Sequence, residues 1–293
     1  MITISLTQGL GNQLFQYFFG ESLKLKFNNQ IEVNYLYDLL PPEQIKMWEL
    51  FDVKINWLNK SKVKESFLLG LTPKKRDLII KFFRTLNLNK NFLVLDDKNF
   101  DVSLININKN IFLRGYWQNI NFFSQSFDQI LKNIKFKNNL NLNHLINSKF
   151  KIKNFKNIIG VHIRGKDYLL NKNSGLKNNI GKTYYLNSMS IMKNKLEKPL
   201  FLLFSDDQDY LKKMNLSNYF NCLNLFDISN DHINDFQYLS QCNYFIIPNS
   251  TFSLWAFYLN KNPNKKIIAP DTWYSFNENC IEKYVYQKFL IKN

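Results

Sequence analysis

Strands and helices alternate regularly in the second half of the chain. Apolar runs predict strands at 157–163, 199–205, 219–225, 243–248 and 265–270. Segments with helical spacing of their apolar residues lie between them, at 184–196, 207–214, 233–242 and 250–260. Because strands separated by helices are joined by right-handed crossovers, this half is expected to form a mostly parallel sheet.

The first half begins with the same kind of unit and then loses its regularity. Residues 1–7 alternate as a strand does, QGLGNQ at 8–13 interrupts the pattern as a glycine loop, and helical spacing follows at 14–27. Between 40 and 110 only a helix-like segment at 75–86 and a strand-like one at 92–95 are recognisable. A strand at 111–118 and a helix at 120–136 complete this half.

An Asn- and Lys-rich stretch at 137–157 contains few apolar residues and is interpreted as a linker between two domains. The predicted domains are residues 1–150 and residues 151–293. The fold class expected from the pattern is α/β, with Rossmann-like strand and helix alternation in the second domain.

Composition identifies a globular protein with a basic surface. The chain has 293 residues, of which 45% are hydrophobic, and a formal net charge of +16. Lys and Arg outnumber Asp and Glu by eight in residues 1–150 and by eight again in residues 151–293. A nucleic-acid-binding protein should instead concentrate basic residues in one stripe with a recognisable motif, so no nucleic-acid partner is expected. Solvated lysines are the plainer explanation of the charge.

The cysteines and the N-terminus indicate a reducing compartment. Cys222, Cys242 and Cys280 are odd in number and lack CxxC spacing, which argues against a disulfide framework or a zinc site. The N-terminus has no leader pattern, and no window approaches about 18 uninterrupted apolar residues. We therefore expect a cytoplasmic protein whose only membrane association is peripheral contact with an anionic inner surface.

Polar clusters follow three of the predicted strands. His162, Arg164 and Asp167 come after the first strand of the second half, Ser205 and Asp206 after the next, and NSTFS at 249–253 after another. Ligands of parallel α/β sheets bind beyond the carboxyl ends of the strands, so these clusters are expected to meet in one crevice.

Arg164 is the most informative residue of these clusters. A buried guanidinium requires an anionic partner. That partner is either a ligand phosphate, which the guanidinium can bind through two parallel hydrogen bonds, or an internal carboxylate, Asp167 or Asp206. His162 shares the strand face of Arg164. Taken alone, it is more simply explained as a buried, hydrogen-bonded histidine.

Two further motifs leave alternatives open. Asp207 and Asp209 form a DxD that fits a metal–diphosphate site, but it also fits the first turn of a helix capped by Ser205 or Asp206, which we favour. GLGNQ has neither GxGxxG spacing nor a P-loop lysine, so ATP or NAD is not expected.

The free N–H groups of the helix that begins near Ser250 are typical of a phosphate site.

Five segments, in this order along the chain, resemble the α-1,2-fucosyltransferases of glycosyltransferase family 11. They are QGLGNQLFQYFFG at 8–20, RGYWQ at 114–118, HIRGKDY at 162–168, FSDD at 204–207 and NSTFSLWAFYL at 249–259. The resemblance implies a GT-B-like fold with two facing α/β domains and the active site between them. It also implies an inverting transfer of fucose from GDP-β-L-fucose to the 2-hydroxyl of a terminal β-galactoside, without a metal or other cofactor.

The resemblance also implies roles for individual residues. Arg164, His162 and Asp167 are the expected catalytic residues, with Asp167 as the candidate general base. The donor-binding residues it implies are Gly11, Asn12, Gln13, His162, Arg164, Ser205, Asp206, Asp235, Asn249, Ser250, Thr251, Phe252 and Ser253. Asp235 would accept two N–H groups of guanine. One position departs from the family, which usually reads HxRRxD: Gly165 stands in place of the second arginine.

Two alternatives of other kinds stay open at the level of sequence. A metal-dependent sugar-nucleotide transferase would use Asp207 and Asp209 with Mn²⁺. A glycan-binding homologue that has lost activity would be consistent with Gly165. The acceptor domain is expected to be residues 1–150, where aromatic side chains offer faces for sugar rings. The oligomeric state cannot be inferred from the sequence.

Overall fold

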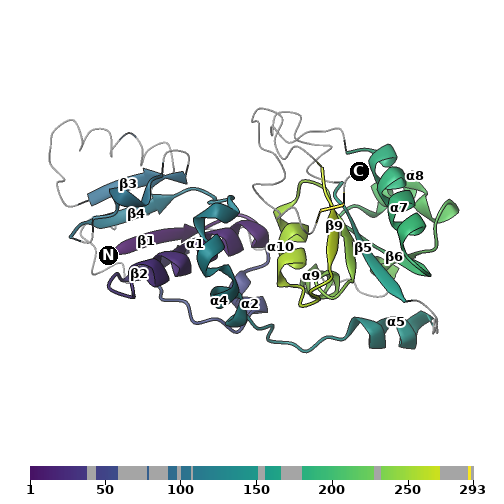
Figure 1. Ribbon diagram of the computed structural model, residues 1–293, viewed down its shortest axis with the longest axis horizontal. Coiled ribbons are helices and arrows are strands. Elements are labelled where there is room, and N and C mark those ends of the chain that lie inside the picture. The colour runs from purple at the N-terminus through teal and green to yellow at the C-terminus, as the bar shows by residue number, and fades with distance from the viewer. Residues whose placement is uncertain are drawn as a thin grey trace.

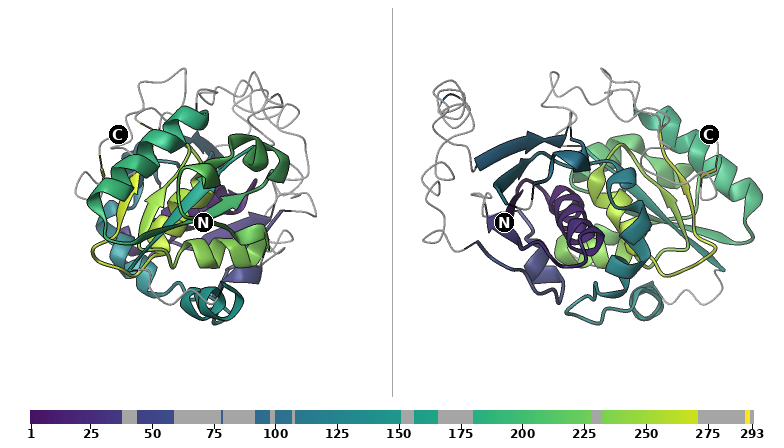
Figure 2. Two further views of the ribbon diagram at one scale, coloured as in Figure 1. Left: turned by 90° about the vertical axis from the view of Figure 1, so that its right-hand side faces the viewer. Right: turned by 60° about the vertical axis from the view of Figure 1, so that its left-hand side comes forward.

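Two parallel sheets lie side by side in the computed structural model of the protein (Figure 1). The structure describes residues 1–37, 44–58, 78, 92–97, 100–106, 108–150, 156–165, 180–227, 232–270 and 290–291. The expected α/β class, with two facing sheets in a GT-B-like arrangement, is confirmed. Figure 2 shows the pair from two other directions.

The first sheet has the strand order β2-β1-β4-β3, and every pair in it is parallel. Its strands are β1 (Ile2–Leu6), β2 (Val33–Tyr37), β3 (Phe92–Asp96) and β4 (Asn110–Arg114). The helices described in this half are α1 (Leu10–Lys26), α2 (Met47–Leu50) and α4 (Phe127–Lys132). Short 3-10 helices span Val102–Leu104, Ile120–Phe122 and Ser124–Ser126.

The second sheet has the order β7-β6-β5-β8-β9 and is also parallel throughout. Its strands are β5 (Asn157–Ile163), β6 (Pro199–Ser205), β7 (Cys222–Asn224), β8 (Tyr244–Ile246) and β9 (Lys266–Ile268). The helices are α5 (Leu142–Phe150), α7 (Lys182–Lys195), α8 (Gln208–Met214), α9 (His232–Leu239) and α10 (Thr251–Leu259). Two 3-10 helices, Leu216–Asn218 and Leu225–Asp227, also lie in the described part of this half.

Side chains of β5 alternate between two layers of core, which explains its uninterrupted apolar run. Ile159 and Val161 belong to a cluster with Met189 of α7, on one face of the sheet. Ile158 belongs to the cluster that contains Leu239 of α9, on the other face. A strand buried on both faces has no polar side, so it is apolar along its whole length.

Helices α1 and α10 lie against each other between the two sheets (Figure 1). The ring of Trp255 lies with its centroid 4.4 Å from that of Phe18 and 5.1 Å from that of Phe15. One hydrophobic cluster therefore runs from β1 through both helices to β9. Within the described residues, the two halves share this core.

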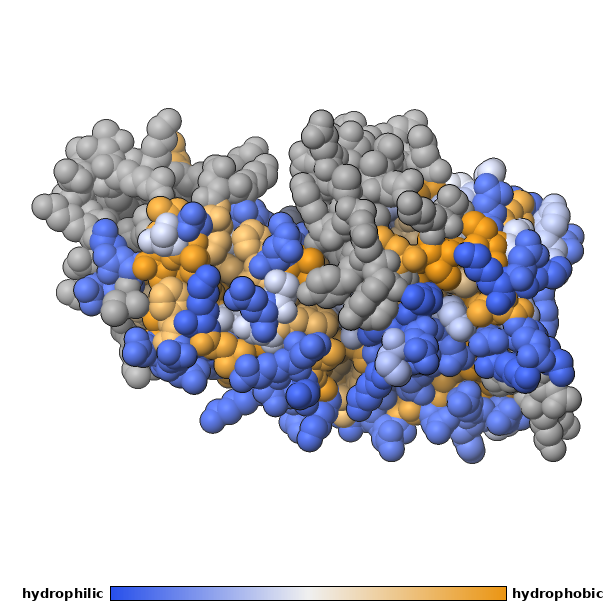
Figure 3. Space-filling model, in the orientation of Figure 1, coloured by the Kyte–Doolittle hydropathy of each residue, from blue (hydrophilic) through white to orange (hydrophobic). Residues whose placement is uncertain are grey.

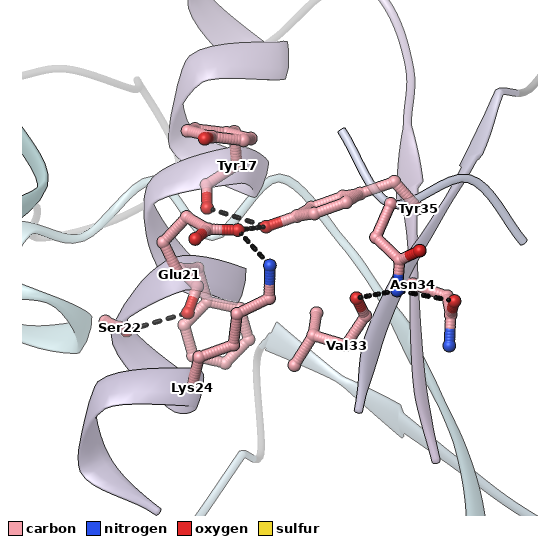
Figure 4. Close-up of polar contacts among 9 residues, drawn as sticks. Tyr17, Glu21, Ser22, Lys24, Val33, Asn34 and Tyr35 are labelled. Carbon is pink, nitrogen blue, oxygen red and sulfur yellow. Dashed lines mark hydrogen bonds and ion pairs between the residues drawn. The ribbon is translucent and has the colours of Figure 1, made fainter. Parts of the chain in front are cut away.

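A partly buried polar cluster fixes β2 against α1 (Figure 4). The Tyr35 hydroxyl lies 2.8 Å from Glu21 Oε1 and 3.1 Å from the carbonyl oxygen of Tyr17. Lys24 Nζ donates to the same Glu21 oxygen over 2.6 Å. Burial, followed by the charge of Glu21, raises the pKa of Tyr35, so this hydroxyl stays protonated and donates its proton.

Two element boundaries predicted from the sequence of the first half are corrected by the structure. The helix expected at 14–27 begins at Leu10, so the glycine loop is largely its first turn. The strand expected at 111–118 ends at Arg114, because Gly115 and Trp117 have φ values of 141° and 56° that leave the extended conformation. Strand β2 was not foreseen, and the segment at 75–86 lies outside the described residues apart from residue 78.

The helix expected at 120–136 is broken. Two 3-10 turns precede α4, and the side chain of Asn119 accepts from the backbone N–H of Asn121. Such local side-chain bonds compete with helical hydrogen bonding, which accounts for the interruption.

The predicted linker at 137–157 contains α5. Leu142 and Ile146, four residues apart, are buried on one face of that helix. Two apolar residues with this spacing were enough to place a short helix on the core. Whether 150 and 151 mark a domain boundary stays a prediction.

Hydrophilic residues cover much of the face shown in Figure 3, with smaller apolar areas between them. Among the described residues, no helix combines the length and the apolar character needed to cross a bilayer.

Candidate functional site

A cavity of about 380 Å³ lies where the two halves meet. The first half contributes Gln8, Gly9, Leu10, Gly11, Asn12, Gln44 and Ile45, and the second half contributes His162, Arg164, Phe204, Ser205, Asp206, Asp235, Thr251 and Phe252. The carboxyl ends of β5 and β6 reach this cavity, as the position of ligand sites in parallel sheets leads one to expect.

Nine of the predicted site residues line the cavity. They are Gly11, Asn12, His162, Arg164, Ser205, Asp206, Asp235, Thr251 and Phe252. Gln13, Asn249, Ser250 and Ser253 are buried and do not line it. Asp167 lies outside the described residues. The functions assigned to these residues stay predictions.

Two helices begin at the cavity, one from each half. Leu10 and Gly11 open α1, and Thr251 and Phe252 open α10. The first N–H groups of a helix have no partner within it, and the helix dipole adds partial positive charge at that end. The cavity is therefore suited to a ligand with negative charge.

Gly11 makes the meeting of these helix ends possible. An added Cβ at Gly11 would lie 2.4 to 2.6 Å from the carbonyl carbon, carbonyl oxygen and Cβ of Thr251. No real side chain tolerates backbone at that distance, so the position requires glycine for close approach.

Arg164 lies directly after β5 and adds a full positive charge to the cavity. Its Nη1 donates to the Ser250 hydroxyl over 3.3 Å. Ser250 is the residue before α10, and its side chain makes no capping bond to that helix. Ser250 thus orients the guanidinium instead of satisfying a helix N–H.

His162 is buried, and its ring is hydrogen-bonded to the start of α10. Its Nδ1 lies 2.9 Å from the Ser253 hydroxyl, which lies 3.3 Å from the carbonyl oxygen of Ser250. The hydroxyl has a single proton, so the tautomer of the ring depends on whether that proton is donated to Nδ1 or to the carbonyl oxygen. Burial, and then the charge of Arg164, lower the pKa of His162 to about 3. His162 is therefore neutral at physiological pH.

The acidic residues after β6 have structural partners. The carboxylate of Asp206 accepts from the backbone N–H of Gly165 over 2.8 Å. Asp207 caps α8, accepting from the N–H of Tyr210 over 2.9 Å. The helix cap that we favoured is thus present, although Asp207 forms it in place of Ser205 or Asp206. Among the described residues, no three His, Cys, Asp or Glu side chains are grouped as a metal site requires.

Gly165 is packed tightly against this cap. An added Cβ would lie 2.4 Å from Cβ of Asp207. An arginine at 165, the residue usual in the family, would require Asp207 to move.

Gln13 supports the cavity wall instead of lining it. Its Nε2 donates to the carbonyl oxygens of Gln8 and Ile45 over 2.8 and 3.0 Å, and its Oε1 accepts from the N–H of Met47. This amide therefore holds the segment at 44–47 against the start of α1.

Six lining residues were not predicted from sequence. Gln8, Gly9 and Leu10 belong to the same turn as Gly11, and their position after a strand was an available signal. Phe204 is the residue before Ser205. Gln44 and Ile45 lie in the irregular region, where no pattern points to the cavity.

Comparison with known proteins places the chain in a family. The model of Glycosyl transferase family 11 matches residues 1–288. The O-antigen biosynthesis glycosyltransferase WbnK of Escherichia coli is 26% identical over 294 residues, covering 93% of this chain and 94% of that protein. An alpha-1,2-colitosyltransferase of Escherichia coli is 26% identical over 301 residues, covering 97% and 98%.

Among solved structures, the fucosyltransferase NodZ from Bradyrhizobium superposes with a TM-score of 0.49 at 16% identity, covering 87% of this chain and 91% of that one. The family assignment depends on the match of the family model over nearly the whole chain. The protein is a glycosyltransferase and belongs to glycosyl transferase family 11.

Proposed function

We propose that the protein transfers L-fucose from GDP-β-L-fucose to the 2-hydroxyl of a terminal β-galactoside, with inversion and without a metal ion. The observation that carries the proposal is the position of Arg164 in a cavity where α1 and α10 both begin. Similarity to an O-antigen glycosyltransferase suggests surface glycan as the product.

The diphosphate leaving group matches the positive charge of the cavity. Negative charge grows on GDP as the bond from fucose C1 to the phosphate breaks. Arg164 and the first N–H groups of α1 and α10 would stabilise that charge, because they are fixed in place before the reaction. Ser250 would contribute by keeping the guanidinium oriented.

The guanine and ribose would lie against the second half. Asp235, in the first turn of α9, lines the cavity and offers two oxygens to the N1–H and N2–H groups of guanine. Adenine lacks this pair of donors, so Asp235 would select GDP over ADP. His162 would form a hydrogen bond with a hydroxyl group of the nucleotide.

The acceptor would approach from the first half, where Gln8, Gln44 and Ile45 form the wall. Its 2-hydroxyl has to lose a proton as it attacks from the side opposite the diphosphate. Asp167 stays our candidate general base. His162 is a poor choice for this step, since a pKa of about 3 makes the neutral ring a weak base.

Turnover of GDP-fucose with lactose, with and without EDTA, tests the proposal. We expect equal rates in both conditions for the wild type and for Asp209→Ala, together with α-1,2 linkage in the product. Loss of activity in EDTA that Mn²⁺ restores would show that a metal takes part. Binding of GDP without any transfer would point to an acceptor other than lactose.

Colitosyl transfer is a second candidate, because one of the two curated relatives is named an alpha-1,2-colitosyltransferase. Colitose is fucose without its 3-hydroxyl group. A direct competition between GDP-fucose and GDP-colitose, read by mass spectrometry of the product, assigns the donor.

A further inference from the structure

Gln118 lies outside the cavity but is hydrogen-bonded to a residue that lines it. Its Nε2 donates to Asn12 Oδ1 over 2.7 Å. Gln118 follows β4 in the first half, and Asn12 is in the first turn of α1, so the bond joins two segments separated by 106 residues.

The oxygen of Asn12 is also used by the second half. The Thr251 hydroxyl, at the start of α10, donates to the same Oδ1 over 3.3 Å. A carbonyl oxygen has two lone pairs, and both are engaged here. Only the Nδ2 group of Asn12 is then left to serve the cavity, and that group is a pure donor.

A primary amide has no intrinsic preference for which of its two ends faces a ligand. The oxygen and nitrogen are nearly equal in size, so partners decide the orientation. In the structure Gln118 and Thr251 both donate to Oδ1 of Asn12, which leaves the donor end of that amide on the other side. In a cavity that carries Arg164 and two helix starts, a third donor is consistent with an oxygen-rich, anionic ligand.

We propose that Gln118 is a positioning residue for glycosyl transfer, which acts through Asn12 by holding its side-chain amide with Nδ2 toward the donor substrate. This inference rests on the proposed function for the identity of that substrate. It assigns no substrate contact to Gln118 itself.

Two substitutions of Gln118 should differ in a way that packing alone does not predict. Gln118→Met keeps the volume and removes the shorter of the two hydrogen bonds to Oδ1, so the Asn12 amide is held less firmly in one orientation. We expect kcat with GDP-fucose to fall by roughly fivefold to tenfold. Gln118→Glu offers only acceptors, draws Nδ2 toward itself and turns Oδ1 of Asn12 toward the substrate. We expect a larger loss than for Gln118→Met.

A double-mutant cycle separates positioning from structural support. In an Asn12→Ala background, Gln118→Met should cost nothing further, because the residue through which it acts is gone. Asn119→Ala is the matched control: it removes the neighbouring side chain that accepts from Asn121 N–H and has no bond to Asn12. Its effect should be the same in both backgrounds. If the double variant loses kcat by the product of the two single-variant factors, Gln118 acts independently of Asn12 and the proposal is overturned.

A second readout needs no substrate. The side-chain NH₂ signal of Asn12 in a ¹⁵N-TROSY spectrum can be identified by its loss in Asn12→Ala. It should shift in Gln118→Met and Gln118→Glu and stay in place in Asn119→Ala. An unchanged signal in both Gln118 variants would overturn the proposal. If the wild type neither turns over GDP-fucose nor binds GDP, the proposed function fails, while this spectrum still decides the role of Gln118.

Discussion

A Cβ atom added to Gly11 would lie 2.4 Å from the carbonyl carbon of Thr251, so α1 and α10 meet with no room for a side chain between them. Gly11→Ala should therefore force these helix starts apart. The cost of overpacking is about 1–3 kcal/mol, which exceeds the gain of about 1 kcal/mol from replacing glycine in a helix. Urea unfolding should show a lower midpoint, and transfer activity should fall.

Gly9→Ala is the matched control for that experiment. Gly9 is two residues away, and nothing lies within 4 Å of a Cβ added there. Its φ of −63° and ψ of 163° suit alanine equally well. We expect a change of less than about 0.5 kcal/mol in unfolding free energy. Equal midpoints for the two variants would contradict the close approach of α1 and α10.

Arg164 should be needed for rate more than for folding. Arg164→Ala removes the only full positive charge among the described residues that line the cavity, and losing such a preorganised group typically lowers kcat by about 10² to 10³. Arg164→Lys restores the charge but not the planar guanidinium that can donate two parallel hydrogen bonds, so we expect a partial recovery of kcat. Steady-state kinetics at saturating GDP-fucose measure both. A wild-type kcat in Arg164→Ala would rule out the leaving-group role.

His162 should make the folded protein less stable in mild acid. Its pKa is about 3 in the folded state, against about 6.5 in an unfolded chain. Between these values only the unfolded state binds the proton, so stability is lost as the pH falls below 6.5. From pH 7 to pH 5 this amounts to about 2 kcal/mol.

The variant His162→Asn isolates this contribution, because other titrating groups are common to both proteins. Unfolding free energies from urea titrations at pH 7 and pH 5 should fall more steeply in the wild type. If the two proteins lose the same amount of stability, His162 is not held neutral. Transfer activity should show no titration step that belongs to His162 between pH 5 and 8.

Asp235 should determine which nucleotide binds. Asp235→Asn replaces one acceptor oxygen with a donor that faces a guanine N–H. Hydrogen bonds to a charged group contribute about 1.5–3 kcal/mol, so GDP should bind roughly tenfold to a hundredfold more weakly. ADP binding should change little. Calorimetric titration with each nucleotide measures the ratio of the dissociation constants of GDP and ADP. An unchanged preference for GDP would show that guanine does not bind at Asp235.

The second sheet was predictable because its strands are buried on both faces. β5 and β6 have the boundaries expected from their apolar runs. Strand ends in a parallel sheet point to one edge, so the amino-acid sequence by itself is enough to assign His162, Arg164, Ser205 and Asp206 to one cavity.

The start of α1 was predicted wrongly because a glycine can either form part of a loop or allow a helix to approach its neighbour closely. In QGLGNQ the glycines were interpreted as a loop, whereas Gly11 is helical and is needed for contact with Thr251, near the other end of the chain. Gln13 shows the same limit: a glutamine in a ligand-binding motif proved to hold neighbouring backbone. Contacts of this kind depend on three-dimensional neighbours, and local sequence does not report them.

The packing of Trp255 on Phe15 and Phe18 also bears on how the protein is made. During synthesis α1 leaves the ribosome long before α10, and its apolar face stays uncovered until α10 has been translated. Contacts so distant in sequence form slowly, and the exposed face of α1 is prone to aggregation in the meantime. Expression at low temperature or with added chaperones should therefore raise the yield of folded enzyme, and truncations before residue 251 should leave α1 without its partner.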